Sequence, residues 1–314
     1  MPSLELLSFV EDDVFYASLA RDGQRGLLVQ HGLDQAYVVD VPTGGVVAVC
    51  PSRPYRFSVT VAAFVCDDTR VLVGGPSDAV VFDAATGAQV RALDGATMAF
   101  SMDLSISPGG TKARLRGQGK DALVFETTGW SKVATLELLE WSRTEWLDER
   151  SMLSAVSGHP SFFRMELDGS WSDANLDVGE IGDEVEWAIS PNRTRMFART
   201  RSAESNRGTA QVLDPRTGDL LADLPVHDAT SHTQHVSFLG ESRVVATEIL
   251  RCEEREGGRS RWVLSLWDLD AETVEVVDWP RDMDVGTLVS LATGGDDVVA
   301  LVNADGAFFC RLVE

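Results

Sequence analysis

The chain has 314 residues, with 27 basic and 49 acidic side chains and a formal net charge of -22 at pH 7. A field of that sign repels phosphate, so we expect neither nucleic acid nor an anionic membrane as a partner. The longest apolar runs have the length of a strand rather than of a membrane-spanning helix. The first residues lack the pattern of a signal peptide, so we expect a cytoplasmic protein.

Two further features of the composition bear on the origin of the protein. Only three of the 27 basic residues are lysines, and together with abundant Ala, Val, Gly and Asp this bias suggests a GC-rich bacterial genome. The four cysteines, at positions 50, 66, 252 and 310, are far apart and form no CxxC pair. In a reducing compartment this spacing predicts free thiols rather than disulfides.

The first predicted element is a surplus apolar strand at residues 4–10, and a repeating unit follows it. Each unit opens with a strand that ends in an apolar residue and is followed by a tight polar turn, as in Ile106-Ser107-Pro108-Gly109-Gly110. Successive anchors of this kind are 40 to 53 residues apart. The seven anchors are Leu19, Val65, Ile106, Trp146, Ile189, Phe238 and Leu291. A regular period of this length is typical of repeat architectures.

A second signal recurs in the same phase of each unit. It is an apolar pair, an acid and a turn closed by Gly, as in Val38-Val39-Asp40 with Thr43-Gly44. A further short strand follows most of these turns, and no segment keeps a helical period. The sequence therefore predicts an all-β fold in which each unit is a four-stranded antiparallel blade and seven blades form a β-propeller.

We expect residues 1–314 to form a single propeller domain. The last unit contains only three strands, which end near residue 313, while the N-terminal strand has no partner in the first unit. We expect residues 3–10 to complete blade seven, because this pairing joins the two ends of the chain and leaves no open sheet edge.

At its turns the chain resembles the WD-repeat propeller family. The Ser-Pro turns at residues 107–108 and 190–191 look like the first hairpin of that family, and Leu266-Trp267-Asp268 is like its name-giving dipeptide. The acid-x-x-Thr-Gly pattern after Asp40, Asp83 and Asp214 is similar as well. The Gly-His pair of the family is absent, so the resemblance implies its architecture without its buried His-Asp network.

Blades five and six carry two arginine-rich polar stretches, at residues 199–207 and 251–261. Residues 193–261 hold eleven arginines and ten acids, a balance of +1, so the rest of the chain carries -23. These stretches are either solvated hairpin tips or a docking surface whose arginine forks bind carboxylates or phosphates of a partner protein. The candidate partner-binding residues are Arg199, Arg201, Arg207, Arg251, Arg255, Arg259, Arg261 and Trp262.

The link between these stretches carries His227, His232 and His235. Zinc needs about four nitrogen or sulfur donors at roughly 2.0–2.3 Å, and a His-x4-His-x2-His spacing in a loop matches no established zinc pattern. We therefore expect exposed histidines, no metal and no cofactor.

The sequence contains no nucleophile elbow, phosphate-binding loop or dinucleotide fingerprint. We therefore expect a non-catalytic scaffold or regulatory subunit of a bacterial multi-protein assembly, monomeric by itself, that binds one or more proteins. The alternative is a propeller enzyme of the lactonase or lyase type, using channel-mouth carboxylates or histidines with a divalent metal. Its candidate carboxylates are Glu145 and Glu186, each followed by a tryptophan.

Overall fold

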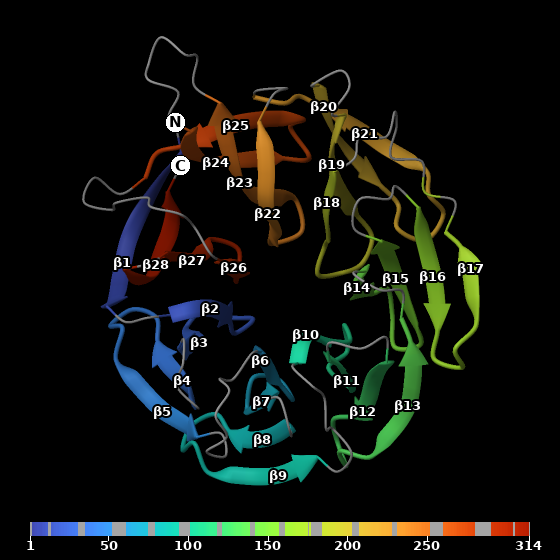
Figure 1. Ribbon diagram of the computed structural model, residues 1–314. Helices are drawn as coiled ribbons and strands as arrows, with labels where there is room; N and C mark the ends of the chain where they lie inside the picture. The colour runs from blue at the N-terminus through green and yellow to red at the C-terminus, as the bar shows by residue number, and fades with distance from the viewer. Residues whose placement is uncertain are drawn as a thin grey trace.

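The chain forms a closed ring of seven four-stranded antiparallel sheets, the blades, around a common axis (Figure 1). The computed structural model describes residues 2–11, 14–30, 35–51, 61–74, 79–93, 101–117, 121–138, 142–156, 161–174, 176, 184–202, 207–227, 231–251, 260–279, 290–303 and 305–313. The predicted all-β propeller is thereby confirmed. Across these residues there is no helix of a length and hydropathy that could cross a membrane.

In blades one to six the four strands follow one another along the chain, and the first strand lies nearest the axis (Figure 1). Blades one to three comprise β2 (Val14–Leu19), β3 (Arg25–Gln30), β4 (Gln35–Asp40), β5 (Val46–Pro51), β6 (Val61–Val65), β7 (Arg70–Gly74), β8 (Ala79–Asp83), β9 (Gln89–Leu93), β10 (Ser101–Ile106), β11 (Lys112–Gly117), β12 (Asp121–Glu126) and β13 (Lys132–Glu137). Blades four to six comprise β14 (Ser142–Trp146), β15 (Ser151–Val156), β16 (Phe162–Glu166), β17 (Trp171–Asp173), β18 (Glu184–Ile189), β19 (Met196–Ser202), β20 (Arg207–Leu213), β21 (Leu220–Leu224), β22 (His232–Leu239), β23 (Arg243–Arg251), β24 (Ser260–Asp268) and β25 (Thr273–Val277).

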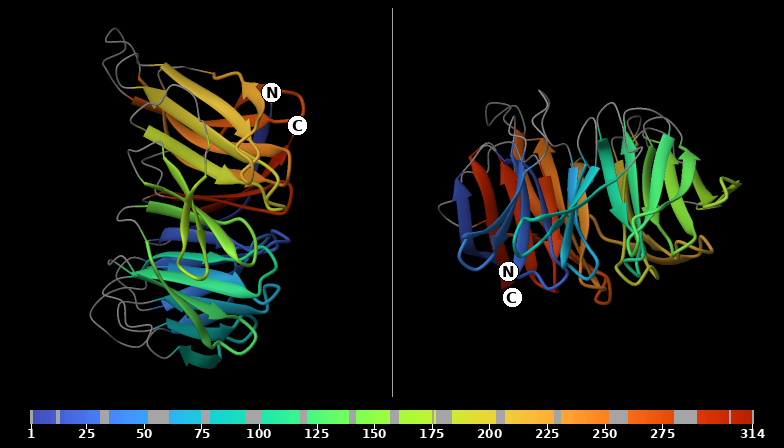
Figure 2. Two further views of the ribbon diagram at one scale, coloured as in Figure 1. Left: turned by 90° about the vertical axis from the view of Figure 1, so that its right-hand side faces the viewer. Right: turned by 90° about the horizontal axis from the view of Figure 1, so that it is seen from below.

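Blade seven joins the two ends of the chain. Its strands β26 (Ser290–Gly294), β27 (Val298–Asn303) and β28 (Gly306–Val313) are completed by β1 (Ser3–Glu11), which pairs antiparallel with β28 from Ser3↔Val313 to Glu11↔Gly306. The termini consequently lie side by side (Figure 2). The predicted closure by the N-terminal strand is confirmed.

Apolar packing between neighbouring blades holds the ring together. The second and third strands of a blade bury both faces, as β7 and β8 do, whereas an outer strand such as β13 is exposed at most of its positions. Trp187 of blade five packs edge-on against Phe162 of blade four, with ring centroids 5.6 Å apart. Trp267 of blade six packs against Phe197 of blade five at 5.1 Å. Large rings fill the wedge between two twisted sheets, which one blade alone cannot bury.

The acid-x-x-Thr-Gly pattern closes the turn between the third and fourth strands. In blade one the backbone N–H of Thr43 donates to Asp40 Oδ2 (3.1 Å), and Gly44 N–H donates to Asp40 O (2.8 Å) with a left-handed φ of 67°. In blade three the equivalent left-handed position is Trp130 (φ 56°), whose N–H donates to the Glu126 carbonyl at 2.8 Å. This conformation lets the Trp130 ring pack against the core between blades two and three.

Candidate functional site

The ring has two faces, seen edge-on in Figure 2. The hairpin face carries the turns between the first and second strands of each blade, at residues 20–24, 66–69, 107–111, 147–150, 190–195, 240–242 and 295–297. The link face carries the connections between blades and the loops between second and third strands. The arginine-rich sector predicted to bind partners belongs to the link face.

Longer strands mark this sector. β23 and β24 have nine residues each and β19 and β20 have seven, against five or six in the second and third strands of blades one to four. Three additional residues at about 3.3 Å each extend the blade-six hairpin by about 10 Å. Residues 199–202 and 207 therefore lie in strands and not in a loop, because the strand ladder of blade five continues to the pair Ser202↔Arg207.

The structure places the candidate residues of this sector at different depths. Arg201 is half-buried on β19, and Trp262 is half-buried on β24, where it packs against the core between blades six and seven. Three arginines, at positions 207, 251 and 261, have described backbones at strand ends. The side chains of these three, and all of Arg255 and Arg259, lie outside the described residues.

Arg199 lies inside the protein, with a side chain only 2% exposed. Its guanidinium donates to Ser231 Oγ (3.1 Å), and its Nε lies 3.6 Å from Oε1 of Glu248 on blade six. Ser231 Oγ donates to the same carboxylate oxygen at 2.6 Å, and Ser265 donates to the other oxygen. Arg199 thus joins blades five and six within the protein, and the docking prediction applies to the remaining arginines of the sector.

The three histidines do not share one environment. His227 is exposed, the side chain of His232 lies outside the described residues, and His235 is half-buried on β22. Burial, and then the charge of Arg143, lower the pKa of His235 below its ordinary value, so this imidazole is neutral at pH 7. Within the described ranges no three His, Cys, Asp or Glu side chains group as metal ligands.

Glu145 and Glu186 lie on the inner strands of blades four and five, and both contact one arginine. Arg143 Nε lies 3.8 Å from Glu145 Oε1, and Arg143 Nη1 lies 3.6 Å from Glu186 Oε2. The tryptophans that follow these acids, Trp146 and Trp187, are buried. The two carboxylates are therefore partners of a shared cation.

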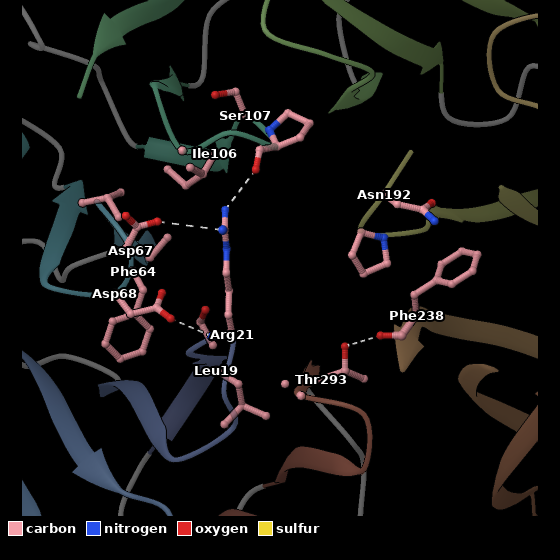
Figure 3. Close-up of a pocket in the computed structure, with 18 of the residues that line it drawn as sticks. Leu19, Arg21, Phe64, Asp67, Asp68, Ile106, Ser107, Asn192, Phe238 and Thr293 are labelled. Carbon is pink, nitrogen blue, oxygen red and sulfur yellow. Dashed lines mark hydrogen bonds and ion pairs between the residues drawn. The ribbon is translucent and has the colours of Figure 1, made fainter. Parts of the chain in front are cut away.

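A cavity of about 660 Å³ opens at the centre of the hairpin face (Figure 3). Turns and strand ends from blades one, two, three, five, six and seven line it. Its apolar floor includes Leu19, Phe64, Ile106 and Phe238 at the ends of inner strands. The charged residues that line it are Arg21, Asp67, Asp68, Arg193, Glu241 and Asp296. Cavities of roughly 300–1,000 Å³ are of the size that binds small organic ligands.

Arg21 crosses part of this cavity from blade one (Figure 3). Its guanidinium donates to the carbonyl of Pro108 on blade three (3.0 Å) and lies 4.0 Å from Asp67 Oδ1, while its backbone N–H donates to Asp68 Oδ2 at 2.9 Å. Cys66, Asp67 and Asp68 are all left-handed, with φ between 51° and 62°. Three consecutive non-glycine residues in this region store backbone strain at the rim of the cavity.

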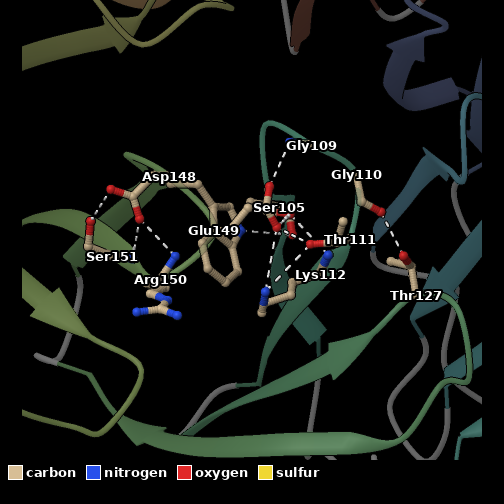
Figure 4. A network of polar contacts seen from close by, with 12 residues as sticks. Ser105, Gly109, Gly110, Thr111, Lys112, Thr127, Asp148, Glu149, Arg150 and Ser151 are labelled. Carbon is tan, nitrogen blue, oxygen red and sulfur yellow. Dashed lines mark hydrogen bonds and ion pairs between the residues drawn. The ribbon is translucent and has the colours of Figure 1, made fainter.

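A carboxylate also ties neighbouring turns together beside the cavity (Figure 4). Glu149 of blade four accepts hydrogen bonds from Ser107 Oγ (2.8 Å), Gly109 N–H (2.6 Å) and the Thr111 hydroxyl of blade three. Its Oε2 lies 3.6 Å from Lys112 Nζ. Burial opposes ionisation of Glu149, but these hydrogen bonds and the lysine outweigh it and lower its pKa below the ordinary value. The Ser-Pro-Gly-Gly turn is thereby fixed to the next blade.

The sequence prediction did not include the cavity or Arg193. One signal in the sequence marks this residue: in the first hairpin of the blades it stands where blades one and three have glycine. Gly23, Gly110 and Arg193 each donate their N–H to the residue three positions earlier, and each has a φ between 64° and 69°.

Comparison with known proteins extends the description of the fold. No protein-family model and no curated protein sequence matches the chain. Among solved structures the chain is similar to the C-terminal WD40 domain of Sif2, with a TM-score of 0.68, 10% sequence identity and 99% of each chain covered. The fold is therefore that of a WD-repeat-like seven-bladed β-propeller. At this level of identity the likeness concerns the fold alone.

Proposed function

We propose that this chain is a non-catalytic scaffold or regulatory subunit of a bacterial multi-protein assembly. In this proposal one or more partner proteins dock on the link face, at the arginine-rich sector of blades five and six. The observation that carries the proposal is the blade-six hairpin, whose nine-residue strands β23 and β24 extend beyond those of blades one to four. The strand ladder of this hairpin continues to the pair Arg251↔Ser260, so its backbone is ordered as far as the end of the described residues.

Charge supports the same sector. Residues 193–261 have a balance of +1 in a chain of -22, so an acidic partner meets the least repulsion there. Guanidinium groups bind carboxylates through two parallel hydrogen bonds, which gives such contacts both strength and orientation. Arginine and tryptophan are also the residue types that dominate the binding energy of protein interfaces.

The buried contacts beneath the sector support a rigid surface. Arg199 and Ser231 both contact the carboxylate of Glu248, which is buried between blades five and six. These contacts fix the base of the blade-six hairpin against the preceding link. A surface that is already ordered loses less conformational entropy when a partner binds.

The experiment is affinity purification of the tagged full chain from its native host, with partners identified by mass spectrometry. The test variant carries Arg251→Glu, Arg255→Glu, Arg259→Glu and Arg261→Glu. The control variant carries Lys132→Glu and Arg150→Glu, which change exposed cations of blades three and four. We expect the wild type and the control variant to recover a partner in stoichiometric amount. The test variant should recover about tenfold less of that partner, or lower still.

Two results would overturn parts of this proposal. If the four changes leave every partner bound, the docking sector is elsewhere on the ring. If no protein is recovered and a divalent metal or small molecule instead raises the melting temperature of the purified chain, the alternative of a propeller enzyme gains support over a scaffold.

A further inference from the structure

The cavity on the hairpin face contains an arginine whose position its local structure does not require. Arg193 occupies the last position of the tight turn Ser190-Pro191-Asn192-Arg193, with φ 64°. In the equivalent turns of blades one and three this position is Gly23 and Gly110, which adopt a left-handed φ without steric cost. An L-residue pays about 1–2 kcal/mol for the same conformation. The turn of blade five therefore carries backbone strain that a glycine at position 193 would not have.

The side chain of Arg193 also carries one polar atom that the protein leaves unsatisfied. Its Nε is buried and has no hydrogen-bond partner among the described residues. Burial lowers its pKa, the charges of Glu145 and Glu241 act against that shift, and the charge of Arg21 adds to it. A buried donor without an acceptor costs about 1–3 kcal/mol, so an acceptor supplied by a ligand would relieve a deficit that the free protein carries.

A second cation faces the same cavity from another blade. Arg21 lies in the first turn of blade one and Arg193 in that of blade five, and both line the cavity. Burial is the main cause of the lowered pKa of Arg193, and the like charge of Arg21 adds a smaller contribution in the same direction. Because both arginines line the cavity, an anion bound there has two cationic partners from different blades.

Four acids also line the cavity, at positions 67, 68, 241 and 296, and none of them accepts a hydrogen bond from the Nε of Arg193. Asp68 accepts the backbone N–H of Arg21, and Asp67 lies 4.0 Å from the Arg21 guanidinium with its own side chain 91% exposed. Glu241 accepts the backbone N–H of Asn192 at 3.3 Å. The contacts of these acids are with backbone or with Arg21, and the Nε of Arg193 is left without an acceptor.

The remainder of the cavity selects among anions. Beneath the charged turns lie Phe64 and Phe238, which are largely buried, and Leu19 and Ile106, which are half-buried. An inorganic anion would leave the exposed parts of these side chains, which are mainly those of Leu19 and Ile106, in contact with water. An anion with an apolar body covers them and gains about 25 cal/mol for each Å² that is removed from water.

We propose that the hairpin-face cavity binds an organic carboxylate, with the carboxylate group at the guanidinium groups of Arg193 and Arg21 and the apolar part against Phe64, Ile106 and Phe238. The carboxylate is either a free acid or an acidic side chain of a peptide. The site is independent of the docking sector, because it lies on the opposite face of the ring and uses different residues.

Calorimetric titration of the full chain tests this site. The probes are hexanoate and phenylacetate as free acids, acetyl-Leu-Glu-Leu-amide as a peptide-borne carboxylate, hexanamide as an uncharged analogue and inorganic phosphate as another oxyanion. We expect a carboxylate probe to bind, hexanamide and phosphate to bind more weakly, and Arg193→Gln to weaken carboxylate binding about tenfold or more. The relative affinities of the free acids and the peptide identify the source of the carboxylate.

Arg195→Gln is the matched control, because Arg195 lies in the same turn but pairs with Asp270 (2.8 Å) and does not line the cavity. It should leave binding unchanged. A second variant, Arg193→Gly, should abolish binding and melt at or above the temperature of the wild type, which separates a ligand-binding role from a structural one. The proposal is overturned if no carboxylate probe binds at millimolar concentration, if Arg193→Gln binds as tightly as wild type, or if hexanamide or phosphate binds as well as hexanoate.

Discussion

Closure of the ring by β1 makes the first residues of the chain a structural element, and their removal tests this directly. Deletion of residues 2–11 removes Leu4, which is 5% exposed, and uncovers Phe308, whose ring stacks on Phe9 at a centroid distance of 4.5 Å. Each of these two losses forfeits about 1.5–3 kcal/mol. The deletion should therefore cost at least about 3 kcal/mol. With an unfolding entropy of about 2.1 cal/mol/K per residue over 314 residues, this loss lowers Tm by at least about 4–5 °C.

The assay is thermal unfolding followed by circular dichroism, first with the deleted chain alone and then with a synthetic peptide of residues 2–11. Within the described part of the chain β1 forms strand pairs along the edge of β28 and at Asp278. The peptide should therefore occupy the open edge and raise Tm as its concentration rises. A scrambled peptide should have no effect. An unchanged Tm on deletion, or equal rescue by the scrambled peptide, would refute the reasoning.

Two point variants on the same strand make the comparison sharper. Leu4→Ala removes a buried side chain and should destabilise the chain by about 2–5 kcal/mol. Leu6 is 42% exposed, so Leu6→Ala should change stability by no more than about 0.5 kcal/mol. Equal effects would show that β1 does not bury the face assigned to it.

Three further predictions concern ionisable groups inside the ring. Arg199→Met should destabilise the chain by about 3–5 kcal/mol in urea unfolding, because it leaves the Glu248 carboxylate buried without its cation. The double variant with Glu248→Leu should recover part of that loss. If the effects of the two changes on stability simply add, the contact between the two side chains is contradicted. Glu149→Gln should cost about 1–3 kcal/mol at pH 7. Because the pKa of Glu149 is lower in the folded state, its contribution to the free energy of unfolding is present above about pH 4.3 and is lost as pH falls below that value. The stability of the variant should therefore fall less steeply with decreasing pH than that of the wild type. His235 has a lowered folded pKa, so stability should fall as pH drops below about 6.5, by at most about 1.4 kcal/mol per pH unit; His235→Phe should remove this slope, and an unchanged slope would assign it to another group.

The architecture was predictable because the repeat signals are local. A strand end followed by a polar turn, and an acid followed by Thr-Gly, each describe a few adjacent residues with a direct conformational meaning. The acid of the second pattern does accept the N–H of the residue three positions later, as Asp40 does from Thr43. The closure of the ring was predictable from the number of strands. The N-terminus has one strand too many and the last blade has one too few, so pairing the first strand with the last blade accounts for both.

The candidate sites were harder to predict because they depend on contacts between distant residues. Arg199 stands in a run of polar residues that resembles a loop, yet the strand ladder continues past it and brings it against Glu248, which belongs to the next blade. The hairpin-face cavity is assembled from six turns of different blades. The sequence of a single turn does not indicate a cavity. Alignment of the seven turns does show that Arg193 stands at a position where other blades have glycine.

The positions of charge connect the fold to the proposed function. Several basic residues of the hairpin face bind neighbouring blades: Arg216 pairs with Asp148 at 3.0 Å, and Arg195 pairs with Asp270 at 2.8 Å. Such pairs are partly exposed and individually contribute about 0–1 kcal/mol. Both pairs connect neighbouring blades, so these two arginines make contacts within the ring. The arginines at the end of the extended blade-six hairpin are the ones that we propose serve a partner.

The most direct test of the scaffold proposal is photo-crosslinking within native host cells. A photoreactive amino acid is placed at position 261, on the extended hairpin of blade six, and separately at position 132, on the exposed outer strand β13 of blade three. The proposal predicts that position 261 crosslinks to a defined protein and that position 132 does not. Absence of any protein adduct at position 261, or the same adducts from both positions, would contradict docking at this sector.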